Sequence, residues 1–235
     1  MTKYKGVKTL EVLEGADNYN QWIVSSLKPF IKSPALEVGA GTGNISEYFL
    51  HLKSIVLTDI DPQLVELLRS KFVHKKNVSF ESLDISAPLT TIKNKFQTIF
   101  AVNVLEHIKK DDQALANIYR MLEPGGSVVL LVPAKKFAYT KLDKSLGHYR
   151  RYEKEELIKI LKKENFEIQK MEYFNVVGLL SWMVRNIVSR NHTVLKKSYV
   201  SVFDSIVPLL RIVEPKKHLP LGISLIVVAK KKKNA

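Results

Sequence analysis

The chain contains no cysteine among its 235 residues. Disulfide bonds, zinc sites built on thiolates and cysteine nucleophiles are therefore excluded. The chain also lacks any run of about 18 uncharged apolar residues, and its first ten residues lack the apolar segment of a signal peptide. We therefore expect a protein without membrane spans that works in the cytoplasm, with peripheral contact to the inner membrane face as a further option.

Acidic residues are few, with 23 Asp and Glu against 37 Lys and Arg, and the formal net charge is +14. This excess favours anionic partners such as phosphates, nucleic acid or acidic lipid. Lysine-rich composition also serves simply to solvate a surface, and residues 230–235 have the composition of a basic tail with a frayed end. Charge alone therefore leaves the class of partner open.

Short apolar runs alternate with amphipathic stretches along the first half of the chain. Five runs have strand composition: Leu36–Val38, Ile55–Thr58, Val78–Ser82, Thr98–Val102 and Val128–Val132. Such alternation predicts βαβ units on a parallel sheet. We therefore predict an α/β fold of the doubly wound, Rossmann-like class, with a seven-stranded, mostly parallel sheet.

The whole chain, 1–235, is expected to form a single domain with two additions to its core. Residues 1–33 are predicted to form an N-terminal helical cap, with a helix over Asn18–Ile31. Residues 34–175 and 221–229 supply the core sheet, including a helix over Glu153–Lys163 and strands over Phe166–Phe174 and Ser224–Val228. Residues 176–220 exceed a hairpin connection and are expected to form a helical lid insertion before the last strand.

Three glycines, Gly39, Gly41 and Gly43, lie between the first predicted strand and a helix expected to begin near Asn44. Glycines allow a tight turn and a close approach of backbone to ligand, and a helix N-terminus offers free N–H groups. Their G-x-G-x-G spacing differs from the G-x-G-x-x-G of dinucleotide sites. Glu37 beneath the loop would repel a pyrophosphate but suits a ligand with an ammonium and a sulfonium.

Two further acids follow predicted strands. Asp59 ends the second strand, near the offset at which an acidic residue binds ribose hydroxyls. Asp84 follows the third strand, where it can accept a hydrogen bond from an adenine amino group while Ile85 packs on the ring. Asp61 precedes Pro62 and is better interpreted as a helix N-cap.

In this order the motifs resemble the class I S-adenosylmethionine-dependent methyltransferases that act on small molecules. The resemblance covers residues 36–43, Asp59, Asp84, residues 100–107 and residues 121–126, and departs from the family at Gln97. It implies S-adenosyl-L-methionine as cofactor and S-adenosyl-L-homocysteine as product. The cofactor-binding residues that it implies are Tyr19, Glu37, Gly39, Ala40, Gly41, Thr42, Gly43, Asp59, Ile60, Asp84, Ile85 and Asn103.

Methyl transfer needs alignment and, for a hydroxyl acceptor, a base. His148 is the predicted catalytic base, although a loop histidine satisfied by the backbone or by Asp143 fits the sequence equally well. His107, beside Glu106, is the rival base, or else a residue that shapes the cofactor pocket. Tyr149, Arg150, Arg151 and Tyr152 are predicted to bind substrate, the arginines by clamping a phosphate or carboxylate. No metal site is predicted.

The segments 176–184 and 202–210 are strongly apolar and are flanked by cationic residues. They suit a lid over an apolar substrate or a membrane interface, and equally suit packing on the sheet or on a second subunit. The favoured function is O-methylation of a small-molecule or lipid-linked acceptor, with acceptors that carry a sugar or phosphate among the candidates. An RNA methyltransferase, with no recognisable RNA-binding appendage, and a non-catalytic cofactor-binding protein are the alternatives.

Overall fold

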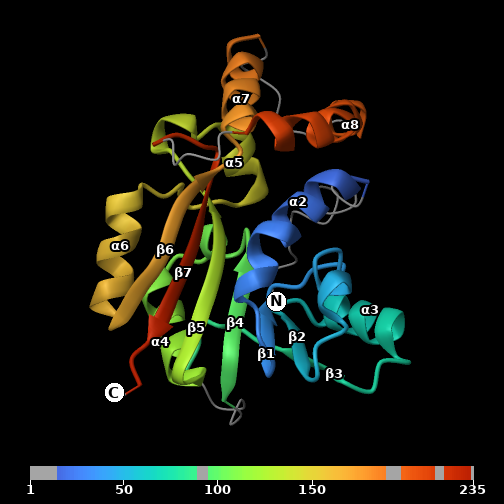
Figure 1. Ribbon diagram of the computed structural model, residues 1–235, viewed down its shortest axis with the longest axis vertical. Coiled ribbons are helices and arrows are strands. Elements are labelled where there is room, and N and C mark those ends of the chain that lie inside the picture. Colours follow the sequence, from blue (N-terminus) through green and yellow to red (C-terminus); the bar gives the residue numbers. More distant parts are fainter. Residues whose placement is uncertain (1–14, 89–94, 189–196, 215–219, 234–235) are drawn as a thin grey trace.

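The computed structural model describes residues 15–88, 95–188, 197–214 and 220–233. Its centre is a seven-stranded sheet with helices on both faces, as Figure 1 shows. The strand order is β3-β2-β1-β4-β5-β7-β6. The strands are β1 (Ala35–Val38), β2 (Ile55–Asp59), β3 (Val78–Ser82), β4 (Phe96–Val102), β5 (Leu122–Pro133), β6 (Phe166–Phe174) and β7 (Ser224–Lys231).

The sheet is parallel except for one strand. Neighbouring strands among β1 to β5 pair in parallel, whereas β7 runs antiparallel to both β5 and β6. The predicted doubly wound, mostly parallel sheet is therefore confirmed. The carboxyl ends of β1, β2 and β4 meet at one edge, which is where a fold of this class binds its ligands.

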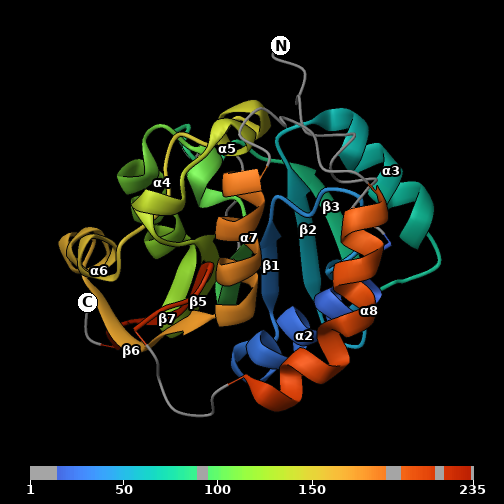
Figure 2. The same ribbon diagram turned by 90° about the horizontal axis from the view of Figure 1, so that it is seen from above.

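Helices cover both faces of this sheet. In Figure 2, α4 and α6 lie on one side, and α2, α3 and α8 lie on the other. The helices are α2 (Asp17–Leu27), α3 (Pro62–Phe72), α4 (Asp111–Met121), α5 (Lys141–Leu146), α6 (Lys154–Lys163), α7 (Val176–Val188) and α8 (Lys197–Val213). The side chain of Asp61 caps α3 by accepting a hydrogen bond from the Gln63 amide, as the sequence predicts.

Alternate residues of the central strands enter the two cores. In β5, Val128 and Leu130 pack into the core beneath α4 and α6, whereas Val129 and Leu131 pack into the core that includes α2 and α3. Because both faces of the sheet are buried at its centre, central strands such as β2 and β5 contain continuous apolar runs, whereas the edge strands β3 and β6 are more polar.

Two predicted helices differ in the structure. The N-terminal helix ends at Leu27, earlier than expected, and continues as a 3₁₀ turn over Lys28–Phe30. Pro29 explains this, because it lacks the N–H that an α-helix would need there. The helix expected near Asn44 is wrong: the glycine loop leads into a short 3₁₀ helix, η2 (Ser46–Phe49). η2 is too short to direct a helix dipole of useful size at the loop.

The last strand is longer than predicted. β7 continues through Lys231, whose Nζ donates hydrogen bonds to the carbonyl oxygens of Tyr119 at 2.9 Å and Leu122 at 3.1 Å. Lys230 and Lys231 therefore belong to the sheet and not to a basic tail. Residues 234–235 lie outside the described residues.

The segment predicted as a helical insertion contains α7 and α8, and α8 is attached to α2. The carboxylate of Asp204 in α8 accepts hydrogen bonds from the Tyr19 amide at 2.8 Å and the Asn18 side chain at 3.1 Å. Within the described part of the chain, no helix is long and apolar enough to cross a membrane.

Candidate active site

The glycine loop at the end of β1 has a backbone that other residues would not adopt easily. Gly39, Gly41 and Gly43 have φ angles of 69°, 58° and 85°. A Cβ atom on Gly39 would lie 2.6 Å from Cγ2 of Val104, and one on Gly43 would lie 2.8 Å from the Phe72 ring. The loop is therefore pressed against the exit of β4 on one side and against α3 on the other.

Two acids lie beneath this loop. Glu37 is buried in β1 and accepts a hydrogen bond of 2.6 Å from the Ser46 hydroxyl. Burial raises the pKa of Glu37 to about 7, with Ser46 opposing the shift and Asp59 adding to it. Because a carboxylate here is poorly solvated, a ligand cation would be a favourable partner for it.

Asp59 at the end of β2 stabilises the loop directly. Its carboxylate accepts hydrogen bonds from the Gly41 amide at 2.9 Å and from the Asp61 amide at 3.0 Å. Burial raises the pKa of Asp59, and these two amides partly offset that effect. The acid predicted to bind ribose therefore also fixes the shape of the glycine loop.

The other predicted cofactor residues lie at the ends of neighbouring strands. Asn103, just after β4, has a φ of 52° and an exposed side chain. Ile60 is 60% exposed, whereas Ile85 is buried. Asp84 is exposed and accepts hydrogen bonds from the amide and hydroxyl of Ser86. These positions lie at the carboxyl edge of the sheet, where the sequence predicts that they contact a nucleoside.

A hollow of about 430 Å³ lies on the flank of the loop. Its lining includes the loop residue Thr42, together with Asp17 and Asn20 of α2 and Lys71 of α3. Neither Asp59 nor Asn103 lines it, so the hollow adjoins the predicted cofactor position and does not coincide with it.

Tyr19 was predicted to lie over the cofactor. Its ring instead packs against Trp22, Phe174 and Phe203, with centroid separations of 5.7 to 6.3 Å. These contacts place the ring in an aromatic cluster between α2, the end of β6 and α8. They give no support to a cofactor-binding role for Tyr19.

A second group of functional side chains surrounds His148, in the loop after α5. Its Nδ1 lies 3.0 Å from Oδ1 of Asp143, which also accepts a 2.8 Å hydrogen bond from Nε of Arg151. Burial raises the pKa of Asp143, but His148 and Arg151 more than offset this and hold the pKa below its usual value. An ionised Asp143 accepts hydrogen bonds and cannot donate, so the neutral His148 ring carries its proton on Nδ1.

The other ring nitrogen of His148 faces Glu106. Its Nε2 lies 4.0 Å from Oε1 of Glu106, whose side chain is completely buried in η3 (Leu105–His107). Neither carboxylate oxygen of Glu106 accepts a hydrogen bond from the described residues. Burial raises the pKa of Glu106 to about 8, with its own backbone and Arg151 opposing the shift.

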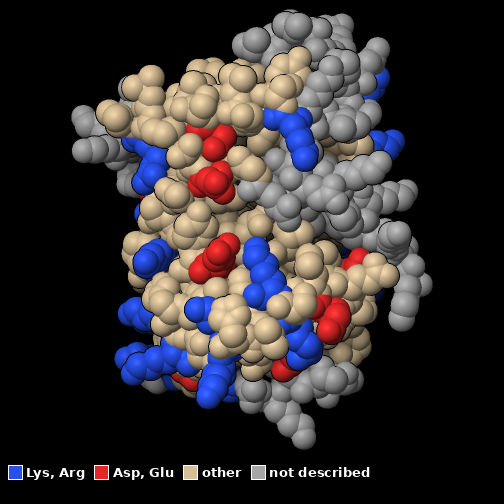
Figure 3. Space-filling view, turned by 90° about the vertical axis from the view of Figure 1, so that its right-hand side faces the viewer, with Lys and Arg blue, Asp and Glu red and all other residues tan. Residues whose placement is uncertain are grey.

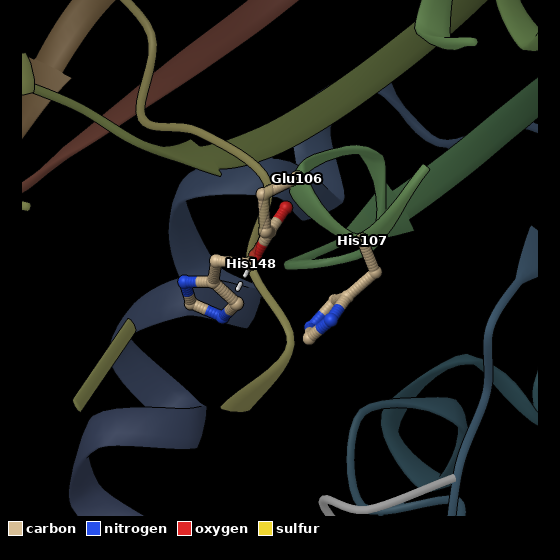
Figure 4. Close-up of side chains that lie close together, drawn as sticks. All are labelled: Glu106, His107 and His148. Carbon is tan, nitrogen blue, oxygen red and sulfur yellow. Dashed lines mark ion pairs between the residues drawn. The ribbon is translucent and has the colours of Figure 1, made fainter. Parts of the chain in front are cut away.

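His107 completes this group, as Figure 4 shows. Its ring centroid lies 4.6 Å from that of His148, with the two rings nearly perpendicular. Burial and the neighbouring His148 lower the pKa of His107 to about 4, against a backbone hydrogen bond with Gly147. The two histidines predicted as rival bases therefore belong to one cluster with Glu106.

Two of the predicted substrate residues prove to be structural. Arg151 is 4% exposed and bonds to Asp143 and to the Ala134 carbonyl oxygen. Tyr152 is 2% exposed and donates its hydroxyl to Asp111 at 2.9 Å. Both side chains are buried and already bonded within the protein, which argues against the predicted contact with substrate.

The remaining two predicted substrate residues differ in their availability. Nη1 of Arg150 forms a 2.7 Å ion pair with Asp111, and Nη2 donates to the Lys109 carbonyl oxygen. Arg150 therefore has less capacity for a ligand anion than predicted. Tyr149 is 56% exposed and stays available to a substrate.

Sequence reasoning missed the partners that make these sites work. It did not assign a role to Ser46, which holds Glu37, and it considered Asp143 only as a residue that could satisfy His148. It also did not anticipate that Glu106 would be buried without a hydrogen-bond partner. The contact of Asp143 with this group becomes evident only in the folded structure, because 36 positions separate Asp143 from His107 along the chain.

Comparison with known proteins agrees with this geometry. Residues 36–128 match the family model described as a methyltransferase domain. The ubiquinone/menaquinone biosynthesis C-methyltransferase UbiE of Shewanella sp. (strain W3-18-1) is 31% identical over 115 residues, which are 46% of this chain and 45% of that protein. The non-reducing polyketide synthase prhL of Penicillium brasilianum is 30% identical over 105 residues, 41% of this chain and 4% of that protein. The chain thus spans less than half the length of these curated relatives.

Solved structures extend the similarity over most of the chain. A Haemonchus contortus phosphoethanolamine N-methyltransferase 2, in complex with S-adenosyl-L-methionine, has a TM-score of 0.62 at 20% identity, covering 92% of this chain and 52% of that one. A putative methyltransferase from Bacillus halodurans C-125 has a TM-score of 0.57 at 19% identity, covering 84% and 92%. At these identities the likeness concerns the fold. Residues 36–128 therefore match a methyltransferase domain, and the fold and the order of the motifs agree with those of class I S-adenosylmethionine-dependent methyltransferases.

Proposed function

We propose that this chain binds S-adenosyl-L-methionine at the glycine loop and transfers its methyl group to an oxygen atom of a small-molecule or lipid-linked acceptor. Similar proteins include one named as a C-methyltransferase and one named as an N-methyltransferase. The family therefore does not fix the acceptor atom, and the argument for oxygen comes from the residues beside the glycine loop.

The cofactor part of the proposal depends on charge and on backbone shape. A methionine ammonium near Glu37 would place a cation beside a buried carboxylate. Asp59 lies at the edge where ribose hydroxyls would bind, and Asn103 follows the adjacent strand. The side-chain-free positions of the loop allow the nucleoside to approach the backbone closely.

The observation that carries the proposal is the Asp143–His148 pair, with its Nδ1–Oδ1 distance of 3.0 Å. It leaves Nε2 of His148 with a lone pair, which can accept the proton of an acceptor hydroxyl. The oxygen then forms a bond to the methyl carbon, and the carbon–sulfur bond breaks with its electron pair moving to sulfur. This yields the methyl ether, neutral S-adenosyl-L-homocysteine and an imidazolium that Asp143 stabilises.

A lipid-linked acceptor is favoured by the outer face of α8. Val200, Asp204 and Val207 face inward, whereas Val202, Ile206 and Leu209 are exposed on the opposite side. Figure 3 views the side of the molecule on which α8 lies; the uppermost part of this side is mostly uncharged, and charges of both signs lie below it. An apolar helix face on a protein with a net charge of +14 suits an anionic membrane surface, where a lipid-linked acceptor would be found.

Incubation with labelled methyl donor and fractionated cell extract tests the proposal. We expect label in a lipid or small-molecule fraction as an alkali-stable ether, or as an ester if the acceptor is a carboxylate. Label in RNA would support the RNA methyltransferase alternative. Cofactor binding by calorimetry without methyl consumption in any fraction would support a non-catalytic role and contradict the proposal.

A further inference from the structure

We propose that Glu106, His107 and His148 together bind one divalent transition-metal cation. Each residue offers one ligand atom, a carboxylate oxygen or a ring nitrogen, and these atoms all lie within 4.8 Å of one another. The three side chains come from two segments, η3 and the loop after α5, that meet at the carboxyl edge of the sheet (Figure 4).

The buried carboxylate of Glu106 is the first argument for a bound cation. It is completely buried, and the described residues donate no hydrogen bond to either oxygen. Buried polar atoms in folded proteins nearly always have a partner, because leaving them without one costs free energy. A cation between Glu106 and the two histidines would supply that partner.

The orientation of His148 is the second, independent argument. Asp143 accepts the Nδ1 hydrogen at 3.0 Å and is itself held by Nε of Arg151 at 2.8 Å. In the neutral ring Nε2 is then the nitrogen with the lone pair, and it faces Glu106. A carboxylate that fixes the tautomer of a histidine in this way is the usual outer partner of a metal-binding histidine.

The ligand chemistry narrows the class of cation. Two imidazoles and one carboxylate suit Zn²⁺, Fe²⁺, Co²⁺ or Mn²⁺ and leave coordination positions open. Bonds of about 2.0–2.2 Å place neighbouring ligand atoms roughly 3.0–3.5 Å apart. The 4.0 Å between Nε2 of His148 and Oε1 of Glu106 is near that range, so small side-chain rotations would close the site.

The site lies beside the glycine loop, because Val104, two residues before Glu106, contacts Gly39. An acceptor oxygen positioned for methyl transfer can therefore occupy an open coordination position. This step rests on the proposed function. A cation held by these residues would occupy Nε2 of His148, and it would then acidify the acceptor hydroxyl in place of the imidazole, with the proton passing to solvent.

Cobalt titration of the untagged, chelator-stripped full chain tests the site without a methyl acceptor. Calorimetry and visible absorption should show one Co²⁺ per chain. Glu106→Gln and His148→Gln should each weaken binding by at least about 100-fold, and Asp143→Asn by about 10-fold. His74→Gln, which changes an exposed histidine outside the cluster, should bind Co²⁺ like the unaltered chain. S-adenosyl-L-methionine affinity, measured on each variant, verifies that its fold is intact.

Absence of saturable Co²⁺ binding would overturn the proposed cation site. Undiminished Co²⁺ binding by Glu106→Gln and His148→Gln variants that retain cofactor affinity would overturn it as well. Stoichiometric binding that requires Glu106 and His148 would support it even if no methyl acceptor were found, in which case the proposed function alone would fail. Methyl transfer that continues at full rate in the chelator-stripped chain would overturn the role of the cation in the reaction.

Discussion

The glycine loop and the histidine cluster lie at the same edge of the sheet but are held in place differently. Backbone conformation sets the loop: three positive φ angles and the hydrogen bond from the Gly41 amide to Asp59 determine where it can run. Side chains hold the cluster, through the chain of contacts from Arg151 to Asp143 to His148. A local backbone feature can be recognised from a short sequence motif, whereas a set of side-chain contacts between separate segments cannot.

The largest effect is expected from a side chain in the loop. Gly39→Val should weaken S-adenosyl-L-methionine binding by more than about 100-fold, because a positive φ disfavours a β-branched residue and the new Cβ would lie 2.6 Å from Val104. Calorimetry measures the affinity directly. Gly15→Val is the matched control, since a Cβ there meets nothing within 4 Å. Unaltered affinity in the Gly39 variant would show that the glycine loop does not bind the cofactor.

Substitutions in the histidine cluster should instead reduce turnover and leave cofactor affinity unchanged. His148→Ala should reduce turnover on the order of 100-fold, because it removes the group that activates the acceptor oxygen, either as base or as cation ligand. The measurement is kcat with saturating methyl donor, alongside cofactor affinity by calorimetry. His74→Ala serves as the control. An unchanged rate would remove His148 from the reaction, and a parallel loss of cofactor affinity would mean that the two regions are one site.

The difference between the regions also explains what the sequence could predict. The fold and the loop were predicted because apolar periodicity and the spacing of Gly39, Gly41 and Gly43 are local signals. Arg151 and Tyr152 were predicted to contact substrate because polar residues after a strand suit a ligand and a buried partner equally well. Their partners Asp143 and Asp111 become evident only when the segments meet in space.

A smaller, pH-dependent effect is expected at Glu37. Its pKa of about 7 means that the carboxyl is mostly protonated at pH 6 and ionised at pH 8, so affinity for the cationic cofactor should increase across this range. Glu37→Gln should remove most of the dependence and weaken binding about 10-fold at pH 8. Calorimetry at several pH values checks this, and an equally steep profile in the variant would assign the dependence to another group.

The raised pKa of Glu37 also predicts how the stability of the ligand-free protein depends on pH. The folded pKa lies above the ordinary value of 4.5, so the folded state holds its proton where the unfolded state has lost it. The stabilisation relative to the ionised form is complete below about pH 4.5 and is lost as the pH rises through about 7. Denaturant titrations should show this decline in the unaltered chain and a flatter profile in Glu37→Gln. A decline of equal size in both would contradict the assignment.

The smallest effect is expected outside both regions, on the exposed face of α8. Replacing Val202 and Leu209 by serine should reduce sedimentation with anionic vesicles about five-fold, because each exposed side chain would lose part of the roughly 1.5–3 kcal/mol that complete burial supplies. Val73→Ser, at an equally exposed apolar position beside α3, is the control. Methyl transfer to a water-soluble acceptor should be unaffected, since neither residue belongs to the loop or to the cluster. Sedimentation that is unchanged in the double variant would exclude this face of α8 as the membrane contact and would leave the acceptor to be sought among soluble molecules.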